Sequence, residues 1–113
     1  MGNDLPAVEN LAGLLSRCAL RDQRAFATLY RASAAKLFAV AVRITRRRDW
    51  AEDVLQESFV NIWNNAAAYS QAKSAPMTWM TAIVRNRALD WLRRPRETEL
   101  GEEHEEMIAA LPD

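Results

Sequence analysis

The sequence has few of the residues that enzymes use to bind metals or to attack substrates. It contains one cysteine, Cys18, and one histidine, His104, in 113 residues. An internal disulfide is therefore excluded, and a grouped zinc site is not expected. The phosphate-binding pattern GxxxxGK and the nucleophile pattern GxSxG do not occur. We expect no catalytic activity, no cofactor and no small-molecule substrate.

Long apolar runs, strand-like alternation and internal repeats are also missing. No apolar run approaches the roughly 18 residues needed to cross a bilayer, and the N-terminus carries no signal-peptide pattern. A single cysteine fits a reducing compartment, so we expect a cytosolic protein. Cys18 lies beside Ala19 and Leu20, which favours a buried thiol over a redox sensor. The length of 113 residues allows one domain with a modest core.

The net charge of zero conceals an uneven distribution along the chain. Residues 1–96 hold all 15 Lys and Arg and eight of the 15 acids, which gives a net charge of +7. Residues 97–113 hold the other seven acids and no Lys or Arg, a net charge of −7. A basic body suggests a polyanionic ligand, and the acidic tail would avoid that ligand or compete with it.

Apolar spacing predicts an all-α fold, a compact bundle of about four helices. The expected helices cover about residues 9–20, 22–46, 49–68 and 75–93. Asp22, Asp49 and Ser74 are candidate N-caps, and Pro76 suits the first turn of the last helix. The second helix carries a long stripe expected in the core: Phe26, Leu29, Tyr30, Ser33, Leu37, Val40, Ala41 and Ile44.

The stretch DWAEDVLQESFVNIWN, residues 49–64, divides into two faces at helical spacing. The expected inward residues are Ala51, Val54 at the edge, Leu55, Ser58, Phe59 and Ile62. The opposite face carries Asp53, Gln56, Glu57, Val60, Asn64 and, at its border, Trp63. No Lys or Arg occurs between Asp49 and Lys73, so this face predicts a docking surface for a basic partner. A solvated acidic helix is the alternative.

The polar loop YSQAKSAP, residues 69–76, precedes the fourth helix. Met80, Val84, Ala88 and Trp91 make one apolar stripe of that helix, and a second stripe combines Trp79 and Ile83 with Asn86, Asp90 and Arg93. We expect Trp79 and Trp91 in the core, with base stacking as the alternative. Asn86 and Asp90 can satisfy each other, a neighbouring helix or a ligand. Arg43 and the run 46–48 either complement the helix dipole or contact phosphate.

Two segments together, AEDVLQESFVNIW at residues 51–63 and TWMTAIVRNRALDWLRR at residues 78–94, resemble region 2 of the sigma-70 family. The likeness is to the extracytoplasmic-function (ECF) group of bacterial sigma factors and extends from about Leu15 to Arg96. It implies that the third helix binds the clamp helices of the largest subunit of core RNA polymerase. The residues implied in this contact are Asp53, Gln56, Glu57, Val60, Trp63 and Asn64.

The resemblance also implies that the following loop and helix recognise the −10 promoter element and capture a base flipped from its non-template strand. The implied DNA-binding residues are Arg46, Arg47, Tyr69, Ser70, Gln71, Lys73, Ser74, Met77, Thr78, Arg85, Asn86, Arg93 and Arg94, with Arg87 as a further phosphate contact. Tyr69 and Trp79 are the only aromatics near the loop, so we expect weaker melting and stricter promoter choice than in primary sigma factors. An anti-sigma factor is a common further partner in this group.

The family's second helical domain, region 4, has no counterpart here. We therefore expect a fragment, with an unusually short family member as the alternative. The expected parts are a flexible N-terminus over residues 1–10, a region 2 domain over 11–96 and an acidic linker over 97–113. A protein-binding helical adapter without DNA recognition is the second hypothesis. A helix-turn-helix repressor is a weaker third, because the loop before the fourth helix is long and lacks a tight glycine turn.

Overall fold

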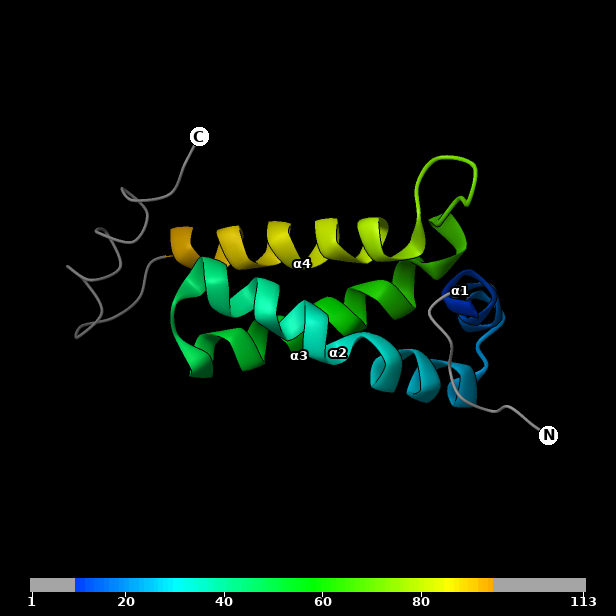
Figure 1. Cartoon of the computed structure of the whole chain (residues 1–113), viewed down its shortest axis with the longest axis horizontal. Coiled ribbons are helices and arrows are strands. Elements are labelled where there is room, and N and C mark those ends of the chain that lie inside the picture. The colour runs from blue at the N-terminus through cyan, green and yellow to red at the C-terminus, as the bar shows by residue number, and fades with distance from the viewer. Residues whose placement is uncertain (1–9, 95–113) are drawn as a thin grey trace.

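The computed structural model describes residues 10–94 as a helical bundle (Figure 1). It contains α1 (Leu11–Ala19), α2 (Gln23–Thr45), α3 (Arg48–Asn65), the short 3-10 helix η2 (Ala66–Ala68) and α4 (Pro76–Arg93). α3 runs back along α2, α4 lies lengthwise beside both and packs against them, and α1 closes one end (Figure 1). No strand occurs among residues 10–94, and the prediction of an all-α bundle is confirmed.

Asp22 is the N-cap of α2, as predicted. Its Oδ1 accepts hydrogen bonds from the backbone N–H groups of Arg24, at 3.0 Å, and Ala25, at 3.1 Å, which satisfies two donors at the helix start. α2 ends at Arg46, which adopts a left-handed φ of 59° and donates its N–H to the Val42 carbonyl. This conformation stops the helix and lets the chain turn back into α3.

The other two predicted caps are wrong. The N-cap of α3 is Arg47, and Asp49 lies in the first turn, where its carboxylate accepts from the Arg47 guanidinium and the Trp50 N–H. The N-cap of α4 is Ala75. Ser74 belongs instead to the preceding turn, because its N–H donates to the Ser70 carbonyl. Pro76 takes the first helical position of α4, as predicted.

The core follows the predicted stripes in part. Four residues predicted in the core are only half-buried and pack against its edge: Phe26, Val40, Ile44 and Trp79. The whole inward set of α3 is buried, and so are Met80, Val84, Ala88 and Trp91 of α4. Tyr30 was predicted in the core but is 42% exposed, and its ring packs on Phe59 at a centroid distance of 4.8 Å. Trp50 was not predicted, yet it is buried and packs against Trp91. The Cys18 thiol is buried, as predicted.

By length and hydropathy, α2 alone among the described helices could cross a membrane. The sequence prediction had found no segment suited to this, because α2 contains no unbroken apolar run of roughly 18 residues. Its buried stripe packs against α1, α3 and α4, and the core helix of a soluble bundle meets the same criteria. The predictions for the flexible N-terminus, Arg96 and the acidic linker fall largely or wholly outside the described residues.

Candidate functional site

The outer face of α3 presents a row of polar side chains around one exposed aliphatic residue. Asp53, Gln56 and Asn64 are exposed, and Val60 is 57% exposed. Within residues 10–94, no side-chain hydrogen bond or ion pair involves the polar groups of these three residues. Their carboxylate and amides therefore remain available to a partner.

Glu57, predicted on the same row, is engaged inside the domain. Its Oε1 accepts a hydrogen bond from the indole Nε1–H of Trp91 at 2.9 Å. The same oxygen lies 3.8 Å from Nε of Arg87 and 3.6 Å from a terminal nitrogen of Arg94. The sequence placed Glu57 outward by helical spacing, but its side chain bends towards α4. Its carboxylate is thus partly neutralised by the domain's own arginines.

Trp63 lies at the border of the row and is half-buried. Its ring packs edge-on against Phe26 at 5.0 Å, and the Arg21 guanidinium stacks 4.8 Å from the ring centroid. Arg21 also donates a 2.8 Å hydrogen bond to the Trp63 carbonyl near the end of α3. An apolar hollow opens beside this pair, lined by Gln23, Phe26, Ala27, Val60 and Trp63. Val60 and Trp63 therefore form the apolar part of the α3 face.

The loop between η2 and α4 is a compact turn closed by Tyr69. The Tyr69 hydroxyl donates to the Ser74 carbonyl at 2.8 Å, and the Tyr69 ring lies 5.4 Å from that of Trp79. The Ser70 carbonyl accepts the N–H groups of Lys73 and Ser74. This closure leaves Gln71 and Lys73 exposed at the tip, Ser70 and Ser74 half-buried below it, and Met77 half-buried and Thr78 exposed at the start of α4.

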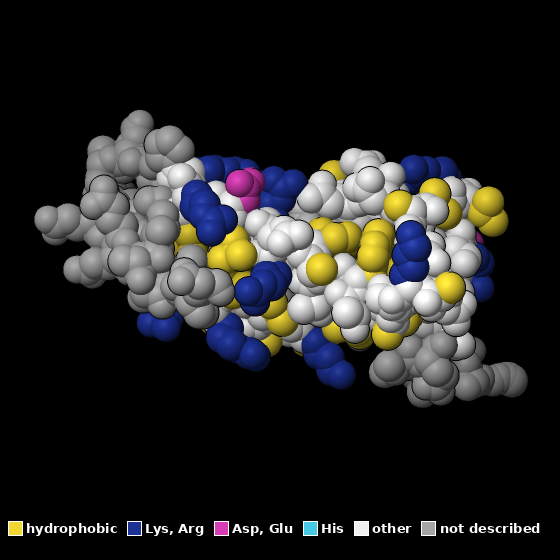
Figure 2. Space-filling model, turned by 90° about the horizontal axis from the view of Figure 1, so that it is seen from above, with side chains coloured by type: hydrophobic (Ala, Val, Ile, Leu, Met, Phe, Trp, Pro, Cys, Tyr) yellow, Lys and Arg dark blue, Asp and Glu magenta, His cyan; other side chains and the backbone are white. Residues whose placement is uncertain are grey.

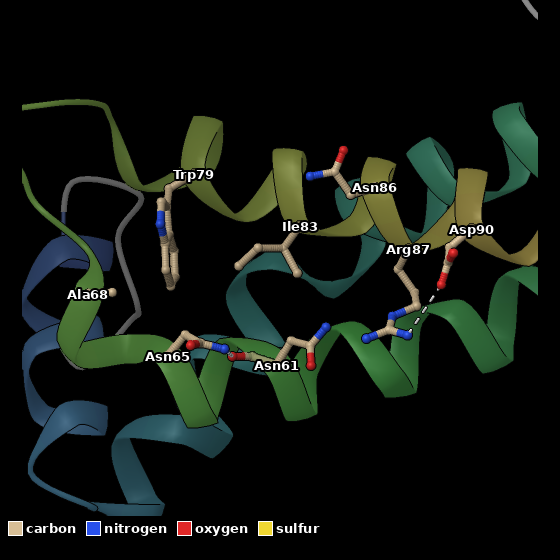
Figure 3. Close-up of a pocket in the computed structure, with 8 residues that line it drawn as sticks. All are labelled: Asn61, Asn65, Ala68, Trp79, Ile83, Asn86, Arg87 and Asp90. Atoms are coloured by element: carbon tan, nitrogen blue, oxygen red, sulfur yellow. Dashed lines mark hydrogen bonds and ion pairs between the residues drawn. The ribbon is translucent and has the colours of Figure 1, made fainter.

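A groove between α3 and α4 begins beside this loop (Figure 3). Trp79 and Ile83 point from α4 towards α3, and Asn61 and Asn65 lie opposite them on α3 (Figure 3). Neither asparagine was predicted as a site residue, although their four-residue spacing places both on one helical face. Asn86 points away from α3 (Figure 3). Asp90 pairs with Arg87 at 3.8 Å, and no hydrogen bond between Asn86 and Asp90 occurs within residues 10–94.

The predicted phosphate-binding arginines lie mainly at the opposite end of the bundle from the loop. The α2–α3 junction, with Arg46 and Arg47, lies beside the end of α4, with Arg93 and Arg94 (Figure 1). α4 has 18 residues, so about 27 Å of helix separates this end from the loop. Basic side chains outnumber acidic ones on the face seen along α4 (Figure 2).

The arginines at this end differ in how they are held. Arg47 forms two hydrogen bonds to Asp49 and stacks 4.8 Å from the centroid of Trp50. Arg94 contacts Glu57 and lies 5.2 Å from the centroid of Trp91. Arg46, Arg85 and Arg93 are exposed. The structure therefore brings four of the predicted arginines to one end, with Arg85 part-way along α4.

Residues 29–98 match the family described as Sigma-70 region 2. The chain belongs to this family. It is 31% identical over 84 residues to the ECF RNA polymerase sigma factor SigK of Mycobacterium tuberculosis, a match covering 74% of this chain and 45% of that protein. The SigK of Mycolicibacterium vanbaalenii is 28% identical over 109 residues, covering 96% of this chain and 56% of that protein. The chain spans about half the length of the curated relatives it matches.

The match to sigma-70 region 2 contains both interfaces predicted from the sequence. It includes most of α2 and all of α3, the loop and α4, whereas α1 precedes it. α1 nevertheless contributes Leu11, Leu14, Leu15 and Cys18 to the core. In this region 2 chain, α1 therefore completes the bundle that supports both surfaces.

Proposed function

We propose that this chain is the polymerase-binding and promoter-recognition domain of an ECF sigma factor, acting in the cytoplasm without catalysis of its own. The observation that carries the proposal is the open row of Asp53, Gln56, Val60 and Asn64 on α3 in a chain of the sigma-70 region 2 family. The proposed partner of this row is the clamp-helix coiled coil of the largest polymerase subunit.

The chemistry of the row suits a basic coiled coil. The Asp53 carboxylate can accept charge-assisted hydrogen bonds from an arginine of the partner. Gln56 and Asn64 can donate or accept, and Val60 and Trp63 add apolar contact between the polar groups. Removing one partner of a buried interfacial charge pair costs about 2–5 kcal/mol. Asp53 should therefore dominate this contact, with Glu57 contributing only what its internal contacts leave free.

A binding measurement with the isolated clamp helices tests this half of the proposal. Asp53→Ala combined with Gln56→Ala should weaken binding at least about tenfold, which corresponds to about 1.4 kcal/mol. Glu52→Ala is the matched control, because Glu52 is an exposed carboxylate of the same helix that pairs with Arg48. Equal losses in both variants would remove the site assignment, and no binding by the wild-type domain would remove the function.

The second half of the proposal concerns DNA. The exposed tip of the loop, with Gln71 and Lys73, offers donors and acceptors near the Tyr69–Trp79 pair, which suits capture of an unpaired base. Arg46, Arg85 and Arg93 offer charges for the backbone of the same strand. Stacking is worth about 1–3 kcal/mol per base, which is small against duplex opening. We expect the isolated domain to bind weakly and to prefer single strands.

Titration with the non-template strand of a −10 element tests this half. Lys73→Ala should weaken binding and reduce the slope of log K against log salt by about 0.7, the value for one phosphate of a single strand. Lys36→Ala is the control, because Lys36 is an exposed lysine on α2 outside the proposed interface. An oligonucleotide of scrambled sequence separates base recognition from charge. Equal affinity for both oligonucleotides would contradict promoter recognition by the domain.

An anti-sigma factor is the remaining proposed partner. A protein that covers the α3 row would block access of the polymerase to it. Hydrogen exchange on such a complex should show protection of α3 or of the 69–75 loop. Protection confined to α1 would contradict this mode of inhibition.

A further inference from the structure

Glu57 belongs to the α3 surface proposed for the polymerase and also contacts two arginines proposed to bind DNA. It lies on α3 one turn after Asp53 and beside Val60, on the side proposed for the polymerase. Its Oε1 makes contacts to Trp91, Arg87 and Arg94 of the α4 region. A shallow hollow lined by Glu57, Val60, Asn61, Arg87 and Arg94 joins the two sides. A single carboxylate thus connects the row on α3 to two arginines.

The two ion pairs are weak enough to exchange. The distances of 3.8 Å to Arg87 and 3.6 Å to Arg94 are longer than charge-assisted hydrogen bonds. The side chain of Glu57 is 39% exposed and that of Arg94 is 36% exposed, so water screens the attraction. The 2.9 Å bond from the Trp91 indole is the directional contact that holds the carboxylate in place. Glu57 therefore offsets arginine charge without fixing the guanidinium groups firmly.

All three described side-chain contacts of Glu57 use Oε1. Its second oxygen can accept from a donor outside the domain, because the side chain is 39% exposed. A guanidinium from a partner at that oxygen would share the single negative charge that now serves Arg87 and Arg94. The two internal arginines would then be left with excess positive charge. Arg87 keeps a second acidic partner, Asp90, at 3.8 Å. Arg94 would therefore lose more of its neutralising negative charge than Arg87 would.

We propose that Arg87 and Arg94 form a phosphodiester-binding subsite, that the Glu57 carboxylate occupies it in the free domain, and that a partner cation on Glu57 opens it. The subsite rests on the proposed function, since the partner cation belongs to the polymerase and the phosphodiester to promoter DNA. By linkage, DNA on these arginines would strengthen the partner's hold on Glu57 by the same factor. The free domain is thereby kept from binding nucleic acid strongly before it joins the polymerase.

The first test compares two variants with the same change of charge. Glu57→Gln removes the negative charge but keeps an oxygen that can accept from the Trp91 indole. Asp53→Asn makes the same change one turn away, where no ion pair is broken. The probe is a single-stranded oligothymidylate titrated over a range of salt concentrations. Glu57→Gln should bind at least about threefold more tightly than Asp53→Asn, with a slope steeper by about 0.7 for each phosphate gained.

The Arg94→Ala background identifies the source of the gain. In that background, Glu57→Gln and Asp53→Asn should bind the oligothymidylate alike, because the released arginine is gone. Equal affinity and slope for the two variants in the wild-type background would overturn the inference while leaving DNA binding intact. No binding by any of the variants at low salt would contradict both the inference and the proposed DNA recognition.

A second measurement decides the matter should Glu57→Gln fail to fold, as judged by thermal melting. The wild-type domain saturated with the isolated clamp helices should bind the oligothymidylate more tightly than the free domain does. Arg94→Ala should abolish that gain without reducing the affinity for the clamp helices in the absence of DNA. An unchanged DNA affinity on clamp-helix binding would overturn the inference.

Discussion

The two ends of this bundle are held together by different kinds of contact. At the loop end, the turn between η2 and α4 is closed by the Tyr69 hydroxyl, two backbone hydrogen bonds and the Tyr69–Trp79 contact. At the arginine end, Trp50 and Trp91 pack at 5.9 Å, and arginines stack near both rings. Few contacts constrain the loop tip, whereas several interlocking contacts constrain the other end.

This difference separates two tasks that a sigma region 2 domain would have to combine. A loop that accepts an unpaired base benefits from exposed, adjustable side chains such as Gln71 and Lys73. A surface that holds a phosphate backbone benefits from arginines with restricted side chains, such as Arg47 and Arg94, which lie near the rings of Trp50 and Trp91, because less side-chain entropy is lost on binding. In the proposed function, the loop would select bases and the arginine end would position the strand.

Replacing Trp91 should lower the free energy of unfolding more than any other change considered, because it removes the packing at the arginine end. Trp91 is 8% exposed, packs against Trp50 and donates to Glu57. Trp91→Ala removes these contacts and leaves a cavity, so the free energy of unfolding should fall by about 3–5 kcal/mol. Urea denaturation followed by circular dichroism measures this loss.

Trp79→Ala is the matched control at the loop end. Trp79 is only half-buried and lines the open groove between α3 and α4, so water can fill part of the space left by its ring. Its replacement should cost clearly less than that of Trp91. An equal or larger loss for Trp79→Ala would show that the loop end is as firmly built as the other.

Tyr69→Phe should loosen the loop end with a smaller effect. The change removes the hydroxyl that donates to the Ser74 carbonyl at 2.8 Å and keeps the ring against Trp79. The expected cost is about 0.5–1.5 kcal/mol, together with faster hydrogen exchange over residues 70–75. Tyr30→Phe is the control, because Tyr30 is also partly exposed and its hydroxyl has no hydrogen bond to a described residue. Equal exchange rates in both variants would contradict the role of Tyr69 in closing the turn.

Helical spacing predicted the core well because burial depends on which way a short side chain leaves the helix. It placed Ala51, Leu55 and Ile62 correctly. The same spacing failed for Glu57, because a long side chain can bend back to a neighbouring helix that the local sequence does not specify. It also could not tell how far Lys73 lies from Arg46, since that distance depends on how the helices pack.

The two wrong caps have a related cause. Asp49 and Ser74 are residue types that favour N-cap positions, and local sequence alone supported both assignments. In the folded chain, the Asp49 carboxylate is held by Arg47, and Ser74 is used to close the turn with Tyr69 and Ser70. Contacts specific to this fold therefore overrode a general preference.

The buried Cys18 thiol should make the stability of the folded domain depend on pH in the alkaline range. Burial raises the pKa of the Cys18 thiol above 9.0, with a further increase from Asp22 and opposing effects of Arg17 and Arg21. The folded state therefore favours the neutral thiol, and its contribution to stability is complete below the unfolded pKa. That contribution is lost as the pH rises from about 9 through the folded pKa. Cys18→Ala should show a smaller loss of stability over this range in thermal melts. Parallel pH profiles for the two proteins would contradict it.

Asp49 should give the smallest effect, at the arginine end. The hydrogen bond from Arg47 holds the pKa of the Asp49 carboxyl below its usual value of 3.8, with a further lowering from the Trp50 N–H and an opposing effect of desolvation. The folded state thus favours the charged form, whose contribution is present above the unfolded pKa and is lost as the pH falls through the folded pKa. Because the side chain is 66% exposed, Asp49→Asn should cost only about 0.2–1 kcal/mol at neutral pH. The difference from wild type should shrink in thermal melts at acidic pH and at high salt. A difference that persists below the folded pKa would show that the side chain's shape, and not its charge, supports the start of α3.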